Sequence, residues 1–98
     1  MITHVASFRW KPETTEADIA AICAGLGTLP ALVPSIRSYS FGRDLVIKDP
    51  TNMDFAVIAT FDSIDGWREY DEHPIHDQVR SELIRPWIAE RAAVQFES

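Results

Sequence analysis

Apolar and polar side chains alternate from residue 2 to residue 10, and this period of two predicts a β-strand with one face in the core. The apolar face also carries a histidine, His4, so its imidazole is expected to point toward the core. Residues 36–42 and 92–96 alternate in the same way and predict two further strands. Such segments are typical of an antiparallel sheet that is buried on one side.

A further predicted strand, residues 55–61, differs from these because it is apolar on both faces. One face carries Phe55, Val57, Ala59 and Phe61, and the other carries Ala56 and Ile58. A strand of this kind is favoured only where other groups cover each of its faces. We therefore expect both faces of the sheet to be covered around this strand.

The segment between the first two strands predicts a helix. Thr14 or Thr15 caps its start, because a threonine hydroxyl accepts a hydrogen bond from the first turn. Its apolar residues recur at helical spacing, and they are Ile19, Ile22, Cys23 and Leu26. Gly27 is expected just beyond the helix, since glycine favours the conformation that ends many helices. Residues 30–34 then connect to the second strand, and residues 44–52 are expected to form a loop.

The helical segment after the third strand is expected to be divided in two. Ser63 caps a short first helix, and His73-Pro74 ends it, because proline disfavours α geometry in the residue before it. Proline suits the first turn of a new helix. A second helix is therefore predicted to begin at Pro74, to bend at Pro86 and to run to about Glu90.

The order of elements is β-α-β-β-α-β, and it predicts one domain over residues 1–98. This is the α+β, ferredoxin-like arrangement of an antiparallel sheet with helices on one face. The strand at residues 55–61 is apolar on the open face too, so the simplest cover is a second copy of the chain related by a two-fold axis. We expect a homodimer.

Composition and charge narrow the range of partners. No apolar run approaches the roughly 18 residues of a membrane span, and the N-terminus lacks the basic and apolar regions of a secretion signal, so a cytoplasmic location is expected. The formal net charge is −6, and the 9 basic residues are scattered, which argues against a nucleic-acid partner. Cys23 is the only cysteine, so an internal disulfide and a thiolate-rich metal site are excluded.

The most informative segment for function is residues 70–76, which places two of the three histidines beside a tyrosine and a proline. A helical wheel puts His76 inside an apolar arc, so it should point at the sheet, as His4 should from the other side. Tyr70 is expected at the edge of the same pocket, next to Trp67. Two imidazoles and a phenol suit general acid–base catalysis on a carbonyl compound, in which a base removes a proton and a donor steadies the oxyanion.

Other interpretations of the same residues stay open. His4 and His76 are also explained as core histidines that hydrogen-bond to protein groups. His73 and His76, with Asp77 beside them, suggest a pair of metal ligands, but His73 precedes Pro74, where capping the new helix is its favoured role. The sequence holds no glycine-rich phosphate loop, nucleophile elbow or dinucleotide fingerprint, and no metal or cofactor is expected.

Several short motifs together resemble the stress-responsive A/B barrel (Dabb) family over nearly the whole chain. They are His4-Val5 in the first strand, Phe61-Asp62, Tyr70, His73-Pro74-Ile75-His76, Arg85-Pro86 and Val94-Gln95-Phe96-Glu97. The resemblance implies a ferredoxin-like α+β fold that pairs through its sheets into a homodimeric α+β barrel. That expectation agrees with the dimer inferred from the strand pattern.

The resemblance also implies an activity, since the family includes a plant polyketide cyclase that closes a linear chain by aldol condensation without a cofactor. By this likeness His76 is the base, and Tyr70 and His4 are supporting catalytic residues. The residues expected to bind substrate are Phe8, Leu26, Trp67, His73, Val79 and Trp87. Leu26 stands where the cyclase has a tyrosine, and the loss of that hydroxyl argues against the same substrate and the same ring closure.

Three functions follow as hypotheses. The first is a cofactor-free cyclase or aldol-type catalyst that takes a small apolar or polyketide-like ligand. The second is a non-catalytic stress-responsive protein, whose pocket binds a small ligand or is filled by its own core. The third is a cofactor-independent monooxygenase, because related barrel families share the architecture and a fold alone does not decide the chemistry.

Overall fold

The computed structural model describes residues 1–48 and 51–98. Its strands are β1 (Ile2–Trp10), β2 (Ser38–Arg43), β3 (Phe55–Phe61) and β4 (Ile88–Glu97), and its α-helices are α1 (Glu16–Leu32), α2 (Ile64–Glu72) and α3 (Pro74–Val79). A π-helical segment, η1 (Arg80–Ile84), and a 3₁₀ turn, η2 (Arg85–Trp87), connect α3 to β4. Within the described ranges, every helix is too short or too polar to traverse a lipid bilayer.

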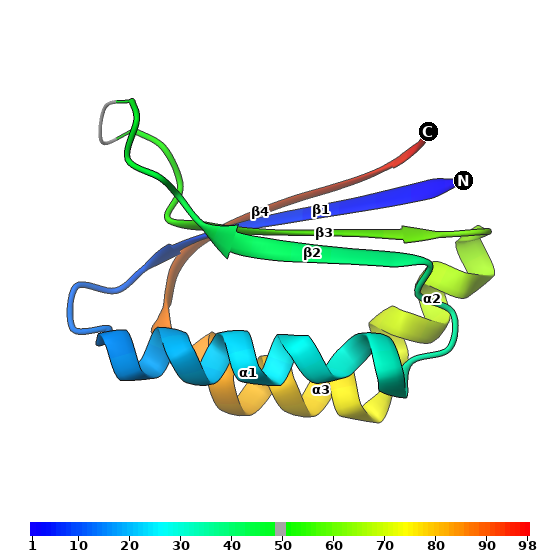
Figure 1. Ribbon diagram of the computed structural model, residues 1–98, viewed down its shortest axis with the longest axis horizontal. Helices are drawn as coiled ribbons and strands as arrows, with labels where there is room; N and C mark the ends of the chain where they lie inside the picture. The colour runs from blue at the N-terminus through cyan, green and yellow to red at the C-terminus, as the bar shows by residue number, and fades with distance from the viewer. Residues whose placement is uncertain (49–50) are drawn as a thin grey trace.

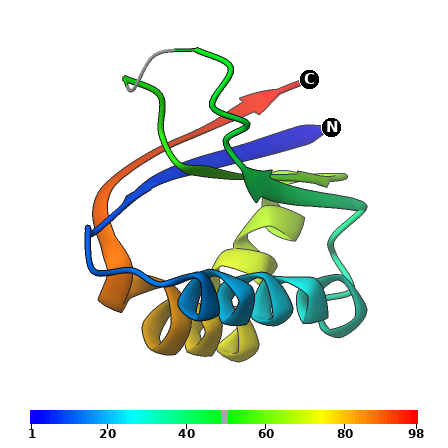
Figure 2. The same cartoon turned by 60° about the vertical axis from the view of Figure 1, so that its left-hand side comes forward.

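The strands form one antiparallel sheet in the order β2-β3-β1-β4. The helices α1 and α3 lie together on one side of this sheet, as Figures 1 and 2 show, and the described helices leave the other side open. The predicted ferredoxin-like α+β fold is confirmed. This arrangement brings the two ends of the chain, β1 and β4, side by side.

The alternation along β1 determines which of its side chains enter the core. His4, Ala6 and Phe8 are all buried beneath the helices. Their neighbours in β3 are Ala59, Val57 and Phe55, and α1 adds Ile22, Leu26 and Leu29 from above. Burying a leucine or phenylalanine side chain contributes about 1.5–3 kcal/mol relative to leaving it exposed. This apolar layer is therefore the main source of stability, and it holds His4 in place.

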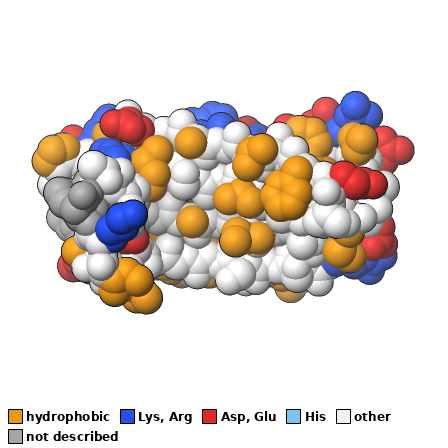
Figure 3. All heavy atoms as spheres, turned by 90° about the horizontal axis from the view of Figure 1, so that it is seen from above, with side chains coloured by type: hydrophobic (Ala, Val, Ile, Leu, Met, Phe, Trp, Pro, Cys, Tyr) orange, Lys and Arg blue, Asp and Glu red, His pale blue; other side chains and the backbone are white. Residues whose placement is uncertain are grey.

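The open face of the sheet is apolar near its middle. Ile58, Val94 and Phe96 are 44%, 53% and 48% exposed. Ile58 and Val94 both pair with Val5, so the side chains of Ile58, Val5 and Val94 form one row across β3, β1 and β4. Figure 3 views this side and shows hydrophobic side chains gathered in its centre, with charged groups toward the two ends.

The predicted helix caps are present. The Thr15 hydroxyl accepts from the Asp18 N–H at 3.2 Å, and the Asp18 carboxylate accepts from the Thr15 N–H at 2.8 Å. Ser63 caps α2. His73 ends α2 and caps α3, because its Nδ1 accepts from the Ile75 N–H at 3.2 Å. The division of this helical segment at His73-Pro74 is thus confirmed.

The predicted end of the first helix at Gly27 is wrong. α1 continues through Gly27 and Pro30, in the segment that was expected to be a connection, and ends at Leu32. Leu29 and Val33 are completely buried at the end of this helix. The burial of two large apolar side chains, at about 1.5–3 kcal/mol each, offsets the roughly 1 kcal/mol that a glycine and the roughly 3 kcal/mol that a proline cost inside a helix. The predicted loop at residues 44–52 includes residues 49 and 50, which lie outside the described residues.

The long helix predicted from Pro74 to about Glu90 is also corrected. α3 gives way to η1 and η2, and the last strand begins at Ile88, earlier than predicted. Ile88 and Glu90 pair with β1, and a helix would lose these sheet contacts. Pro86 lies at the start of η2, where its missing N–H has no helical partner to lose.

Candidate active site

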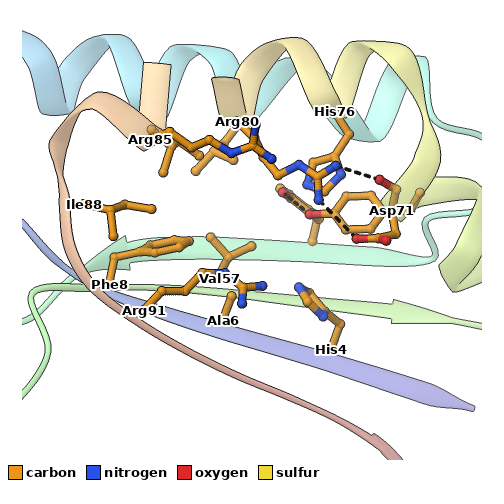
Figure 4. Close-up of a pocket in the computed structure, with 14 residues that line it drawn as sticks. His4, Ala6, Phe8, Val57, Asp71, His76, Arg80, Arg85, Ile88 and Arg91 are labelled. Atoms are coloured by element: carbon orange, nitrogen blue, oxygen red, sulfur yellow. Dashed lines mark hydrogen bonds and ion pairs between the residues drawn. The ribbon is translucent and has the colours of Figure 1, made fainter. Parts of the chain in front are cut away.

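A cavity of about 370 Å³ lies between the sheet and the helices (Figure 4). Its lining residues are His4, Ala6, Phe8, Leu26, Tyr39, Val57, Tyr70, Asp71, His76, Arg80, Ile84, Arg85, Ile88 and Arg91. They combine apolar side chains with histidines, tyrosines, arginines and one aspartate. Every strand contributes at least one of them, so folding is what assembles this site.

Tyr70 lies at the centre of the polar groups. Pro74 starts α3, and this places His76 in the first turn, where its imidazole stacks on the Tyr70 ring with 4.0 Å between centroids. The hydroxyl oxygens of Tyr70 and Tyr39 are 3.0 Å apart, and either can donate. Tyr70 and His76 are only 2% and 6% exposed. The Tyr70 ring is therefore held against an imidazole while its hydroxyl contacts a second phenol.

His4 approaches the same tyrosine from the sheet. Its ring centroid lies 5.8 Å from that of Tyr70. Gln95, its partner across β1 and β4, places its side-chain Nε2 2.9 Å from His4 Nδ1. An amide nitrogen only donates, so with this contact Nδ1 accepts and the proton of neutral His4 lies on Nε2. The other edge of the His4 ring is then an N–H donor.

Both cavity histidines are neutral at pH 7. Burial lowers the pKa of His76 to about 4, and the nearby Arg80 guanidinium acts in the same direction. Burial also lowers the pKa of His4, and the positive charge of Arg91 adds to this effect. Burial raises the pKa of Tyr70, so its hydroxyl stays protonated. The site thus offers uncharged acceptors and donors of protons.

Arginines that were not predicted from the sequence border the cavity. Arg80 donates to the Asp71 carboxylate at 3.1 Å and to the Asp71 backbone carbonyl at 2.9 Å. Arg85 donates to the Ser81 hydroxyl at 3.0 Å. The side chain of Arg91 makes no hydrogen bond or ion pair with the residues that the structure describes. Figure 4 shows Arg80 and Arg85 on the helix side of the cavity and Arg91 on the sheet side.

The fold occurs in a known family. The family model described as the stress responsive A/B barrel domain, Dabb, matches residues 2–98. The chain belongs to the Dabb family. The resemblance that its short motifs predicted is therefore confirmed.

Solved structures share the fold of this Dabb chain. A dimeric ferredoxin-like protein of unknown function from Thermobifida fusca is 40% identical, with a TM-score of 0.90 over 99% of this chain and 90% of that one. The hydroxynitrile lyase from Passiflora edulis is 20% identical, with a TM-score of 0.85 over 97% and 90%. A candidate antibiotic biosynthesis monooxygenase from Nitrosomonas europaea is 18% identical, with a TM-score of 0.79 over 100% and 98%. These last two likenesses show the fold alone. No curated protein matches the chain.

The structure of the Dabb chain brings the three predicted catalytic residues, His4, Tyr70 and His76, to one cavity. Two predicted binding residues, Phe8 and Leu26, also line it. The other predicted binding residues, Trp67, His73, Val79 and Trp87, do not. The predicted histidine and tyrosine cluster is thus present, whereas its predicted surroundings are only partly so.

Each residue outside the cavity has a different position. Trp67 contacts the His4 ring but lines a second cavity of about 310 Å³, which lies near the chain ends, beside Ile2 and Glu97. His73 caps α3 through its ring nitrogen. Val79 is buried in the core, and Trp87 packs against that core from η2. Their contribution to substrate binding in the Dabb chain would have to be indirect.

The metal-ligand interpretation gains no support from this Dabb structure. Among the described residues, no three or more His, Cys, Asp or Glu side chains are grouped as a metal ion would require. The Nδ1 of His73 already accepts a hydrogen bond from the Ile75 N–H. His76 instead faces the cavity, stacked on Tyr70.

Proposed function

We propose that this Dabb protein is a homodimeric, cofactor-independent acid–base catalyst that acts on a carbonyl compound in a lyase, aldol or cyclase type of reaction. The observation that carries the proposal is the stack of His76 on Tyr70 in a cavity that also holds His4 and Tyr39. A base and a hydrogen-bond donor within reach of one cavity are the groups that proton abstraction beside a carbonyl requires.

His76 is the proposed base. Its Nδ1 is buried, so Nε2 is the ring nitrogen that can reach a substrate. Backbone groups of Asp71 and Tyr70 also interact with this ring and oppose part of the lowering of its pKa. The lowered pKa, about 4, keeps the ring neutral and free to accept a proton, although it also makes His76 a weak base in the empty cavity. An enolate forming beside the ring would raise this pKa, because a nearby negative charge favours the imidazolium. A positioned base contributes a rate factor of about 10²–10⁴.

Tyr70 and His4 are the proposed donors to the oxyanion. When the Tyr39 hydroxyl donates to Tyr70, the Tyr70 proton is free to point at a substrate oxygen. His4 offers the N–H at Nε2, because its Nδ1 accepts from Gln95. Donors aimed at the position where negative charge develops stabilise the transition state, and the loss of one costs a factor of about 10²–10³ in rate.

The apolar part of the lining indicates what else the substrate carries. Phe8 and Leu26 border the cavity beside Val57, Ile84 and Ile88. These side chains suit an aliphatic or aromatic portion of a ligand. Leu26 supplies no hydroxyl, so this part of the cavity favours an apolar contact over the hydrogen bond of the plant cyclase. We therefore propose a substrate different from that of the cyclase.

The proposal includes a dimer formed through the open face of the sheet. Ile58, Val94 and Phe96 are exposed there, and covering them would contribute about 25 cal/mol for each Å² of apolar surface buried. The Thermobifida fusca relative is described as dimeric. A single monomeric species at micromolar concentration, in size-exclusion chromatography with light scattering, would contradict this part of the proposal.

One fold relative gives modest support to the lyase type of reaction. It is named a hydroxynitrile lyase, so the fold accommodates lyase chemistry. That name does not assign a substrate to this chain.

The test is hydrogen–deuterium exchange of a carbonyl compound in D₂O, followed by the loss of its α-proton signals in ¹H NMR spectra. The wild-type protein should accelerate the exchange of at least one compound in a panel of small ketones and oxo acids. His76→Ala should lower that rate by about 10²–10⁴-fold. The matched control is His73→Asn, which changes a histidine outside the cavity and keeps a side chain that caps helices. Equal rates in the wild type and His76→Ala would remove His76 from the mechanism.

A second candidate function is ligand binding without turnover. The pKa of His76, lowered to about 4, favours it, because a weakly basic imidazole is suited to a neutral hydrogen-bonding role. Native mass spectrometry that finds a retained small molecule, together with no exchange of any carbonyl compound, would favour this function.

A further inference from the structure

The charge of the cavity contrasts with the charge of the whole chain. The formal net charge is −6, with 15 acidic residues. The cavity lining nevertheless includes Arg80, Arg85 and Arg91 and only one carboxylate, that of Asp71. Asp71 already forms an ion pair with Arg80, with 3.1 Å between the guanidinium nitrogen and the carboxylate oxygen. Two arginines at the cavity therefore face it with no acidic partner in the part of the chain that the structure describes.

Arg85 and Arg91 approach the cavity from opposite sides. Figure 4 shows Arg85 on the helix side, above Ile88, and Arg91 on the sheet side, where its chain runs toward His4. Arg91 pairs with Phe8 across β1 and β4, and this register places it on the cavity face of the sheet. Arg85 uses one nitrogen on Ser81, and a guanidinium has five N–H groups. Most of the donors of both arginines thus remain available to a ligand.

We propose, on the basis of the function proposed above, that the substrate is a small oxocarboxylate whose carboxylate is bound by Arg85 and Arg91. Its carbonyl group then lies at Tyr70 and His76. Guanidinium groups bind carboxylates through paired, charge-assisted hydrogen bonds. An anion between two unpaired cations also relieves their mutual repulsion.

The proposed binding mode fits the chemistry at the other end of the cavity. His76 Nε2 takes a proton from the carbon beside the carbonyl. The electrons of that C–H bond form a C=C bond, and the carbonyl π electrons move to oxygen, which accepts hydrogen bonds from Tyr70 and His4. Return of a proton from His76 to carbon restores the ketone. The substrate carboxylate keeps its charge throughout.

A carboxylate at the arginines would also help the base. Burial is the largest cause of the lowered pKa values of His76 and His4, and the positive charges of Arg80 and Arg91, respectively, add to it. A bound anion offsets part of this positive field and raises both pKa values toward that of an ordinary histidine. His76 is then a stronger base with a substrate present than without one.

The test measures binding separately from turnover. Titrations followed in ¹H–¹⁵N spectra compare a series of 2-, 3- and 4-oxocarboxylates with their methyl esters, on the wild type and on His76→Ala. At least one acid should bind, with a Kd about 10-fold or more below that of its ester. Arg85→Gln and Arg91→Gln should each raise that Kd by about 10-fold. The matched control is Arg68→Gln, which removes the same charge from an exposed site whose ion-pair partner is Asp65.

A second measurement does not depend on the ligand. The pKa of His4, followed by NMR, should be higher in Arg91→Gln than in the wild type and unchanged in Arg68→Gln. The inference is overturned if no oxocarboxylate binds to the wild type, or if acids and esters bind equally, whatever the variants do.

The inference is also overturned if the α-protons of the esters exchange as fast as those of the acids, but this result leaves the proposed function standing. Arginine-dependent binding of acids without any exchange supports the anion site and contradicts the proposed function.

Discussion

The protonation of His76 should make the stability of this protein depend on pH. Burial and Arg80 lower the pKa of His76 in the folded chain to about 4, from the 6.5 of an unperturbed histidine. As the pH falls below 6.5, the unfolded chain therefore binds this proton before the folded chain does. Stability from this group is complete above pH 6.5 and is lost as the pH falls toward 4. The whole pKa difference corresponds to about 3.5 kcal/mol, because a pKa difference of one equals about 1.4 kcal/mol, and about 3 kcal/mol of this is lost by pH 4.

The assay is urea denaturation at pH 7 and at pH 4, at one protein concentration so that dimerisation does not change the comparison. Carboxylates also titrate in this interval, so the relevant comparison is with His76→Gln, which keeps a polar side chain and removes the titration. The wild type should lose about 3 kcal/mol more unfolding free energy than His76→Gln between the two pH values. Equal losses in the two proteins would refute the buried, neutral His76 on which the proposed mechanism depends.

Other predictions concern the dimer, the helix packing and the oxyanion donor. Ile58→Lys should give a monomer in size-exclusion chromatography with light scattering, whereas Leu32→Lys, at an exposed residue of α1, should leave the dimer intact. Gly25→Ala should lower the unfolding free energy by up to about 2 kcal/mol, because its Cβ would lie 2.5 Å from the Leu83 Cδ1 atom and the cost of this overlap, about 1–3 kcal/mol, exceeds the roughly 1 kcal/mol that alanine gains in a helix. Gly27→Ala, whose Cβ would come no closer than 4.0 Å to a side chain, should raise stability by up to about 1 kcal/mol in the same denaturation assay. Tyr70→Phe should slow α-proton exchange by about 10²–10³-fold and leave binding affinity nearly unchanged.

The histidines of the proposed catalytic cluster could be predicted because the position of each depends on local geometry. His4 follows from the period of two along β1, which a strand maintains. His76 follows from helical phase, and only a fraction of a turn separates it from Pro74, where the helix begins. Tyr39 was missed, although the sheet register contains the signal. It pairs with Ala59, which pairs with His4, so all three lie on one face of neighbouring strands.

The arginines and Trp87 show where local reasoning fails. Arg80 follows His76 by four residues, so a helical wheel already places both on one face. Beyond Arg80 the chain becomes π-helical, and the extra residue in such a turn rotates all later side chains. Trp87 is thereby displaced from the predicted arc, and Arg85 reaches the cavity. Arg91 lines the cavity only because β4 pairs with β1 from Ile88 onward, a tertiary contact that helical periodicity does not contain.

The proposed function requires that His76 catalyse proton exchange. The most direct test compares the rate of deuterium exchange catalysed by the wild type with the rate catalysed by His76→Gln. The comparison is made at pH 7, with both proteins shown to be folded by circular dichroism, and with an oxocarboxylate that binds both. The proposed mechanism predicts that the wild type exchanges α-protons about 10²–10⁴-fold faster. Indistinguishable rates at equal saturation would contradict it.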